Sequence, residues 1–247
     1  PFFMYFATND VHVPRFPHQR FRGKSGMGLR GDAIAQFDWS VGEVVRALKE
    51  AGIFERTLII LSSDNGPVVD DGYADEAVAR LKNHKPWGPF RGGKYSTFEA
   101  GTRVPFIIHW PERVKAATSP ALVSQIDMTA TLARLVGAKN IADIPADSRD
   151  QLPAWLGKDL KGREYVIGAG SSLTVLTPEW KYIEPSQASP YNVLTNTELG
   201  NQPEEQLYHI VTDRGEYDNI AKEKPEIVGE MKTILEKEKS KGVGMEL

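Results

Sequence analysis

The sequence contains no cysteine among its 247 residues, which excludes disulfides, thiolate metal sites and a cysteine nucleophile from this chain. It has no apolar run approaching the roughly 18 residues of a membrane-spanning helix. Its formal net charge is only -3, so composition predicts neither nucleic acid nor an anionic membrane as a partner. Any attraction for an anionic substrate must therefore come from a few well-placed cationic side chains.

Residues 1–7 are apolar or aromatic throughout, which predicts a buried strand. No initiator methionine, charged region or small-residue cleavage site accompanies them, so they are not a signal peptide. We therefore expect the chain to begin within a core strand, as a truncated protein would. The alternative is a domain whose first strand simply opens the chain.

Strand and helix patterns alternate along the first part of the chain. Residues 32–51 carry apolar side chains at helical spacing, which predicts a helix with Asp32 as its N-cap. Residues 57–62 predict a central parallel strand, residues 103–110 another strand, and residues 124–136 a short helix. This order favours an α/β fold with a mostly parallel sheet and flanking helices.

The pattern changes beyond residue 143, where several short strands are predicted. They lie at residues 165–169, 172–176, 180–184 and 207–210. A final helix at residues 225–239 has one apolar face. We therefore divide the chain into an α/β part, residues 1–143, and a small subdomain, residues 144–247, with an antiparallel sheet and one covering helix.

Asp64 and Asn65 follow the predicted central strand directly, where open α/β sheets place their ligands. A carboxylate and a carboxamide offer hard oxygen ligands, which suit Ca²⁺ or Mg²⁺. The alternative is a plain turn, because Asp-Asn-Gly-Pro is a typical turn sequence.

Two basic residues are further candidates. Lys94 follows paired glycines, which let the backbone approach a ligand closely, and its ammonium could bind an anionic group. His12 follows the first predicted strand and could act as a general acid or bind an anion. The alternatives are a solvated basic loop and an exposed histidine. Converging on one sheet edge with a cation, these side chains would stabilise a transferring sulfuryl or phosphoryl group.

The order of these segments resembles the type I, formylglycine-dependent sulfatases of the alkaline phosphatase-like fold, whose catalytic domain residues 1–143 would then partly form. The segments that carry the resemblance are residues 9–14 (NDVHVP), 36–42 (QFDWSVG), 61–66 (LSSDNG) and 92–105 (GGKYSTFEAGTRVP). Residues 123–128, 180–183 and 205–221 are similar to later segments of that family.

The resemblance implies roles for four residues. Asp64 and Asn65 match the second pair of ligands to a divalent cation, usually Ca²⁺, with Mg²⁺ as the alternative. Lys94 matches the lysine that contacts the sulfate, and His12 matches the histidine near the leaving-group oxygen. The sequence departs from the pattern at Val11, where the family often has proline.

The larger departure is the nucleophile. The family carries a Cys/Ser-x-Pro-x-Arg motif that is converted to formylglycine, and this sequence contains none. We expect that motif, the first pair of metal carboxylates and a further Lys and His to lie upstream, in a missing N-terminal part of the same protein. We therefore expect this chain alone to be inactive. Family resemblance also suggests a periplasmic or secreted location.

The substrate that the resemblance implies is a sulfate ester, and we expect a sulfated sugar hydrolysed from the chain end. The long loop after Asp64 contains polar side chains that suit sugar hydroxyls: Asp70, Asp71, His84 and Lys85. These residues could instead only support the loop. Two other functions stay open, namely a phosphomonoester or phosphonate hydrolase of the same fold and a non-catalytic glycan-binding remnant.

Overall fold

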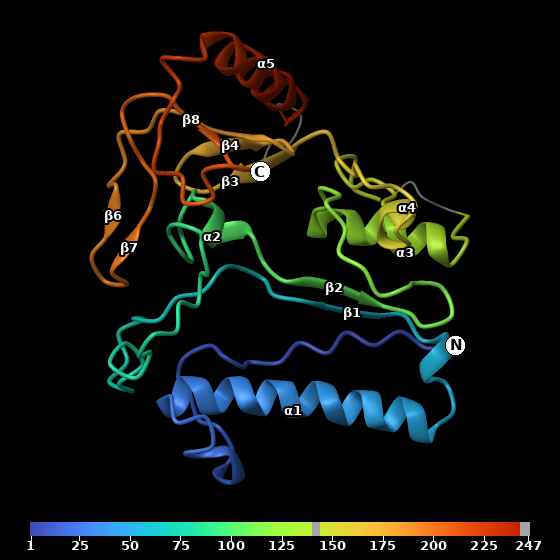
Figure 1. Cartoon of the computed structure of the whole chain (residues 1–247). Helices are drawn as coiled ribbons and strands as arrows, with labels where there is room; N and C mark the ends of the chain where they lie inside the picture. Colours follow the sequence, from blue (N-terminus) through green and yellow to red (C-terminus); the bar gives the residue numbers. More distant parts are fainter. Residues whose placement is uncertain (140–143, 243–247) are drawn as a thin grey trace.

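The structure is a computed structural model that describes residues 1–139 and 144–242. It is an α/β protein (Figure 1). As far as Trp155 the chain contains α1 (Gly28–Glu50), β1 (Ile59–Ser62), α2 (Glu99–Thr102), β2 (Phe106–His109), α3 (Met128–Leu135) and α4 (Leu152–Trp155). From Val166 onward it contains β3 (Val166–Ala169), β4 (Leu173–Leu176), β5 (Trp180–Ile183), β6 (Tyr191–Asn192), β7 (Thr197–Glu198), β8 (Gln206–His209) and α5 (Pro225–Gly242). Three short 3-10 helices, η1 (Gln19–Phe21), η2 (Phe54–Arg56) and η3 (Gln125–Asp127), complete the described elements.

The predicted C-terminal sheet is confirmed. Strands β3, β4, β5 and β8 form it in that order, and every neighbouring pair is antiparallel. Helix α5 lies over this sheet (Figure 1). The main apolar core fills the space between them and consists of Tyr165, Val175, Tyr182, Leu207, Ala221, Val228, Met231 and Leu235.

The predicted parallel pairing of the strand at residues 57–62 is wrong. Strand β1 pairs antiparallel with β2, from Ile59 opposite His109 to Ser62 opposite Phe106. A parallel pair needs a crossover connection, usually a long helix. Here a long loop and the four-residue α2 return the chain instead, so β2 runs back along β1.

The predicted first strand is also wrong among the described residues. Residues 1–7 run as an extended segment between α1 and the β1–β2 ribbon (Figure 1), but no ladder hydrogen bond joins them to a described strand. Their aromatic side chains are exposed rather than buried, with Phe3 79% and Tyr5 85% exposed. Apolar composition alone does not make a strand, because a strand also needs a neighbour that pairs with its backbone.

Helix α1 begins at Gly28, four residues before the predicted start, and Asp32 is not its N-cap. The Asp32 carboxylate is buried and accepts hydrogen bonds from the backbone of Gly23 and from both the backbone and the hydroxyl of Ser25. It therefore fixes the loop before the helix. Of the described helices, none is long and apolar enough to span a membrane.

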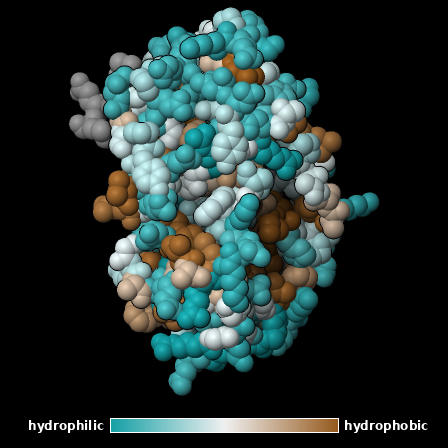
Figure 2. Space-filling view, turned by 60° about the vertical axis from the view of Figure 1, so that its left-hand side comes forward, coloured by the Kyte–Doolittle hydropathy of each residue, from teal (hydrophilic) through white to brown (hydrophobic). Residues whose placement is uncertain are grey.

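The two parts meet where Phe98, just before α2, packs with Ile183 of β5 and Tyr208 of β8. The predicted boundary at residue 143 lies outside the described residues, so the division into two domains stays a prediction. Apolar side chains gather on the lower half of the face in Figure 2, while the upper half is mostly hydrophilic. The C-terminal part therefore has its own core, whereas the N-terminal part leaves much apolar surface exposed.

Candidate active site

Lys94 and His12 lie side by side, although 82 residues separate them in the sequence. Nζ of Lys94 is 3.3 Å from Nε2 of His12, which is within hydrogen-bonding distance. His12 is exposed and Lys94 is half-buried, so a ligand can reach both. The structure thus brings together the two residues that the sequence predicted as catalytic.

The hydrogen bond made by the second ring nitrogen of His12, Nδ1, indicates which ring nitrogen carries the proton. Nδ1 lies 2.7 Å from the carbonyl oxygen of Val13. A carbonyl oxygen only accepts, so Nδ1 carries a proton and donates it. Nε2 of the neutral ring then has a free lone pair, which accepts a hydrogen bond from the Lys94 ammonium. The pair presents a fixed cation beside an imidazole nitrogen, which can bind an anionic ester and exchange a proton with it.

Asp64 and Asn65 form the turn after β1, as their sequence predicts. The backbone N–H of Asn65 donates to Oδ1 of Asp64 at 3.0 Å, and Nδ2 of Asn65 donates to the carbonyl of Gly66 at 2.8 Å. The side-chain nitrogen of Asn65 is engaged by this bond, while its side-chain oxygen is left to bind another partner. The turn therefore also offers two side-chain oxygens.

Backbone hydrogen bonds fix the Lys94 loop to this turn. The N–H of Lys94 donates to the carbonyl of Pro67, and the N–H of Gly66 donates to the carbonyl of Gly101, both at 2.9 Å. The backbone of Ala100 lies so close to Gly66 that no side chain fits at residue 66. A Cβ there would lie 1.6 Å from the carbonyl oxygen of Ala100. The turn and the Lys94 loop therefore form one unit.

A glutamine that was not predicted supports the same unit from another element. Nε2 of Gln125, at the start of η3, donates to the hydroxyl of Ser62 at 2.9 Å and to the carbonyl of Ser63 at 2.5 Å. These bonds hold the end of β1 immediately before Asp64. A lone glutamine in a loop gives no sequence signal for this role.

A buried ion pair, also missed by the sequence analysis, positions the His12 segment. Nη1 of Arg15 lies 2.6 Å from Oδ2 of Asp75, and the two side chains are only 2% and 9% exposed. Nε of Arg15 donates to the carbonyl of Val11 at 3.2 Å. Arg15 therefore anchors the segment that carries His12 to the loop that follows the Asp64-Asn65 turn. No local pattern reveals a pair that spans 60 residues.

The C-terminal part holds the Lys94 loop from the other side. The backbone N–H and the hydroxyl of Thr97 both donate to the carbonyl of Leu199 at 2.9 Å. Arg91, at the start of the loop, binds both carboxylate oxygens of Glu198 in β7 at 2.7 and 3.1 Å. The position of Lys94 therefore depends on residues about one hundred positions further along the chain.

A buried charge cluster lies behind this loop. Nζ of Lys181 is 2.9 Å from Oε1 of Glu99 and 3.5 Å from Oε1 of Glu216, with all three side chains at most 2% exposed. Burial works to raise the pKa of Glu99, but the charges of Lys181 and Arg103 hold it below its ordinary value. Burial raises the pKa of Glu216 to about 7, against the attraction of Lys181.

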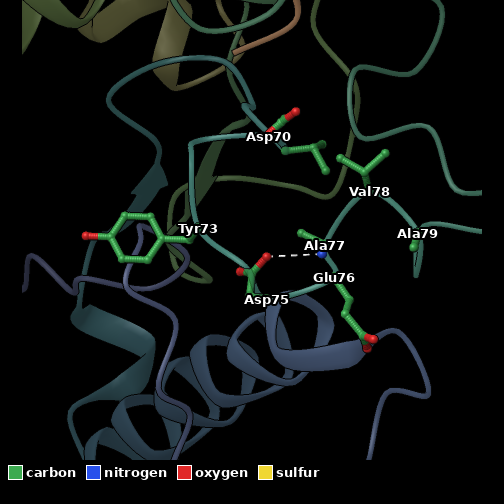
Figure 3. Close-up of a pocket in the computed structure, with 8 residues that line it drawn as sticks. Asp70, Tyr73, Asp75, Glu76, Ala77, Val78 and Ala79 are labelled. Atoms are coloured by element: carbon green, nitrogen blue, oxygen red, sulfur yellow. Dashed lines mark hydrogen bonds between the residues drawn. The ribbon is translucent and has the colours of Figure 1, made fainter. Parts of the chain in front are cut away.

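The four predicted substrate-binding residues are not joined to this unit. Asp70 lines a shallow pocket formed by the loop from Val69 to Ala79 (Figure 3). Asp71 follows it, and His84 and Lys85 are exposed side chains further along the same loop. Among the described residues, no hydrogen bond or ion pair connects these four side chains to His12, Lys94 or the Asp64-Asn65 turn. Their role in binding stays a prediction.

The Asp64-Asn65 turn supplies only part of the ligand shell that a hard cation needs. The side-chain oxygens of Asp64 and Asn65 are the type that Ca²⁺ and Mg²⁺ prefer. Over the described ranges, no group of three or more His, Asp or Glu side chains could hold a metal ion. Ca²⁺ takes six to eight oxygen ligands, so this turn fits as part of a coordination shell and needs further ligands to complete it.

Comparison with known proteins identifies the class to which this arrangement belongs. The Sulfatase family model matches residues 1–138. An N-acetylgalactosamine-6-O-sulfatase from Bacteroides thetaiotaomicron is 48% identical over 243 residues, which cover 98% of this chain and 48% of that protein. Human arylsulfatase A is 34% identical over 66% of this chain and 30% of its own length. The chain therefore belongs to the sulfatase family.

Solved structures agree. One solved structure comes from work on the metabolism of multiple glycosaminoglycans by Bacteroides thetaiotaomicron. It superimposes on this chain with a TM-score of 0.91 at 48% identity, over 94% of this chain and 49% of that chain. A sulfatase from Pseudoalteromonas sp. gives a TM-score of 0.78 over 94% of this chain and 46% of its own, and at 24% identity it shows a likeness of fold alone. The present chain spans about half the length of the relatives that it matches.

Proposed function

We propose that this chain is part of a sulfuric ester hydrolase that removes sulfate from a sulfated sugar, acting from the end of a glycan. The contact between Lys94 and His12, beside the Asp64-Asn65 turn, carries the proposal. An N-acetylgalactosamine 6-sulfate group is the first substrate to test, because the relative with 48% identity is named for it.

The proposed roles follow from the geometry. Lys94 provides a fixed positive charge for a sulfate oxygen. Nε2 of His12, on an exposed side chain, can take up a proton from solvent and is placed to pass it to the sugar oxygen that leaves. Asp64 and Asn65 provide part of the ligand shell of a divalent cation, Ca²⁺ or Mg²⁺. Such a cation would neutralise charge on the sulfuryl oxygens.

We further propose that the nucleophile comes from outside this chain. A formylglycine requires a cysteine or serine in the motif Cys/Ser-x-Pro-x-Arg, which the sequence lacks. The relatives are about twice as long as this chain, so a longer protein has room for that motif and for the remaining metal ligands. The exposed apolar side chains of Phe2, Phe3 and Tyr5 are consistent with a surface that such a part would cover.

The test measures binding, because binding does not need the nucleophile. Sodium sulfate is titrated into the chain with CaCl₂ present, and the affinity is measured by calorimetry. We expect Lys94→Ala to weaken binding by about tenfold or more, since a charge-assisted hydrogen bond is lost. Lys222→Ala, at an exposed lysine of the C-terminal part, serves as the matched control and should bind like the parent.

Three outcomes would contradict the proposal. If Lys94→Ala and the Lys222→Ala control bind sulfate equally well, the Lys94–His12 pair is not the anion site. If the parent prefers inorganic phosphate to sulfate by a wide margin, the phosphoester hydrolase becomes the better hypothesis. Binding of sulfated glycan without any role for Lys94 would favour the non-catalytic remnant.

A further inference from the structure

Tyr95, which follows Lys94 directly, has a backbone conformation that tyrosine rarely adopts. Its φ angle is +79°. The N–H of Ser96 donates to the carbonyl of Gly93 at 2.9 Å, so residues 93–96 form a four-residue turn with Tyr95 in the third position. A positive φ at that position is the mark of a type II turn, which normally has glycine or asparagine there. A tyrosine at this position is therefore strained.

The surrounding structure imposes this strain rather than relieving it. The N–H of Lys94 is bound by Pro67 on one side of the turn, and Thr97 is bound by Leu199 on the other. The next residue, Phe98, is 1% exposed and packs between the two parts of the chain. The turn cannot relax, so a glycine or an asparagine would suit position 95 better than tyrosine does.

Packing within the described residues does not explain the tyrosine either. Its side chain is exposed, with 48% of the residue surface accessible to solvent. Its hydroxyl group takes part in no hydrogen bond with the described residues. A large ring is thus held half-exposed at the surface, at a cost in backbone strain, with no hydrogen bond from its hydroxyl group to the described residues. Strain of this kind points to a function of the side chain.

The ring lies close to the candidate active site. Nζ of Lys94 lies 5.4 Å from the centroid of the Tyr95 ring, and the same Nζ is 3.3 Å from Nε2 of His12. The ring therefore borders the place where a sulfate would bind. The group that carries such a sulfate would lie within reach of this exposed ring.

We propose that Tyr95 determines specificity, because its ring packs against the sugar ring of a substrate whose sulfate is held by Lys94 and His12. A pyranose ring presents C–H groups on its faces, and an aromatic ring offers a flat apolar surface of matching size. The inference rests on the proposed function, since it takes Lys94 as the sulfate ligand. It assigns to Tyr95 the recognition of the sugar rather than of the anion.

The experiment compares two probes on the complete chain, N-acetylgalactosamine 6-sulfate and sodium sulfate, titrated separately with CaCl₂ present. The parent should bind the sugar sulfate more tightly than inorganic sulfate. Tyr95→Asn removes the ring but suits the left-handed backbone, so the sugar sulfate should bind about three- to tenfold more weakly while inorganic sulfate is unaffected. Tyr95→Phe keeps the ring and should bind both probes like the parent. Tyr5→Asn, at another exposed tyrosine, is the matched control.

Thermal unfolding supplies the second readout. Because Tyr95→Asn relieves strain, its Tm should rise by about 2–4 °C, which separates lost binding from lost folding. If the parent binds no sulfate, the proposed function and this inference both fail. If the parent binds sulfate but Tyr95→Asn keeps the full preference for the sugar sulfate, the role of Tyr95 alone is overturned.

Discussion

Lys181 of β5 and Glu99 of α2 form a buried ion pair, with Nζ of Lys181 2.9 Å from Oε1 of Glu99. Glu216 completes the cluster, and its Oε2 accepts a hydrogen bond from the backbone N–H of Glu99 at 2.6 Å. Since Glu99 lies five residues after Lys94 in the sequence, this cluster ties the loop of the candidate site to the C-terminal sheet. A charged group from each part is thus desolvated at the junction, so the junction should respond to pH.

Stability should fall as the pH rises from about 4.5 to about 7, because of Glu216. Burial raises the pKa of Glu216 from 4.5 to about 7. Between these values the folded protein keeps a proton that the unfolded chain has released. The contribution of this group to the free energy of unfolding therefore decreases with rising pH, by up to about 1.4 kcal/mol per pH unit.

Glu216→Gln should remove that decline, because a glutamine oxygen still accepts from Glu99 but does not ionise. The variant should match the parent near pH 5 and exceed its stability near pH 8, as measured by urea unfolding across the range. Glu223→Gln, at an exposed glutamate, is the control and should leave the pH profile unchanged. Identical profiles for the parent and Glu216→Gln would rule out this assignment.

Breaking the Arg15–Asp75 pair should destabilise the chain strongly. Both side chains are almost fully buried, at 2% and 9% exposure. Arg15→Met leaves the Asp75 carboxylate desolvated without its partner, which costs about 3–5 kcal/mol of unfolding free energy. The exposed pair Arg46–Glu50 is the matched control, and Arg46→Met should leave the free energy of unfolding nearly unchanged. Denaturant unfolding measures both, and equal losses would contradict the burial argument.

The sequence predicted best those features whose partners lie close in the chain. The strands from Val166 to His209 pair with one another, so their alternating pattern and the apolar face of α5 were enough to define the sheet and its cover. Residues 1–7 have the composition of a strand, but composition does not reveal which backbone pairs with it. The antiparallel β1–β2 pair was missed because a loop, rather than a crossover helix, connects the two strands.

The residues of the candidate site likewise divide into those with a local sequence signal and those without one. Lys94 and the Asp64-Asn65 turn have local signals, namely paired glycines and a turn sequence after a strand. The structure then adds the contact between Lys94 and His12, which no local pattern encodes. Arg15 had no such signal, because its partner Asp75 lies 60 residues away and a buried ion pair has no period or motif.

Gly66→Ala should disrupt the turn that carries the predicted metal ligands. The added Cβ would lie 1.6 Å from the carbonyl oxygen of Ala100, and backbone cannot move aside as a flexible side chain can. We expect a loss of more than about 2 kcal/mol in unfolding free energy. Gly229→Ala within α5 is the matched control, since a Cβ there meets nothing within 4 Å. It should stabilise the chain by about 0.5–1 kcal/mol.

This chain should bind a sulfate ester without hydrolysing it. Sulfuryl transfer to water by the family's route needs a formylglycine, and this sequence lacks the motif from which one forms. Lys94 and His12 are proposed to bind the ester, and neither provides that nucleophile. The purified chain should therefore release no sulfate from N-acetylgalactosamine 6-sulfate above the background of buffer, even with CaCl₂ present. Ion chromatography of released sulfate measures this directly.

Lys94→Ala is the control that interprets any release in that assay. Activity that the parent shows and the variant loses would mean that this chain carries its own nucleophile and that the proposal of an outside source is wrong. Release that persists undiminished in Lys94→Ala would come from a contaminant, because the proposed site would hold the anion far more weakly. If neither protein releases sulfate while the parent still binds it, binding and chemistry are separated as proposed, and the residues described here perform the binding half of the reaction.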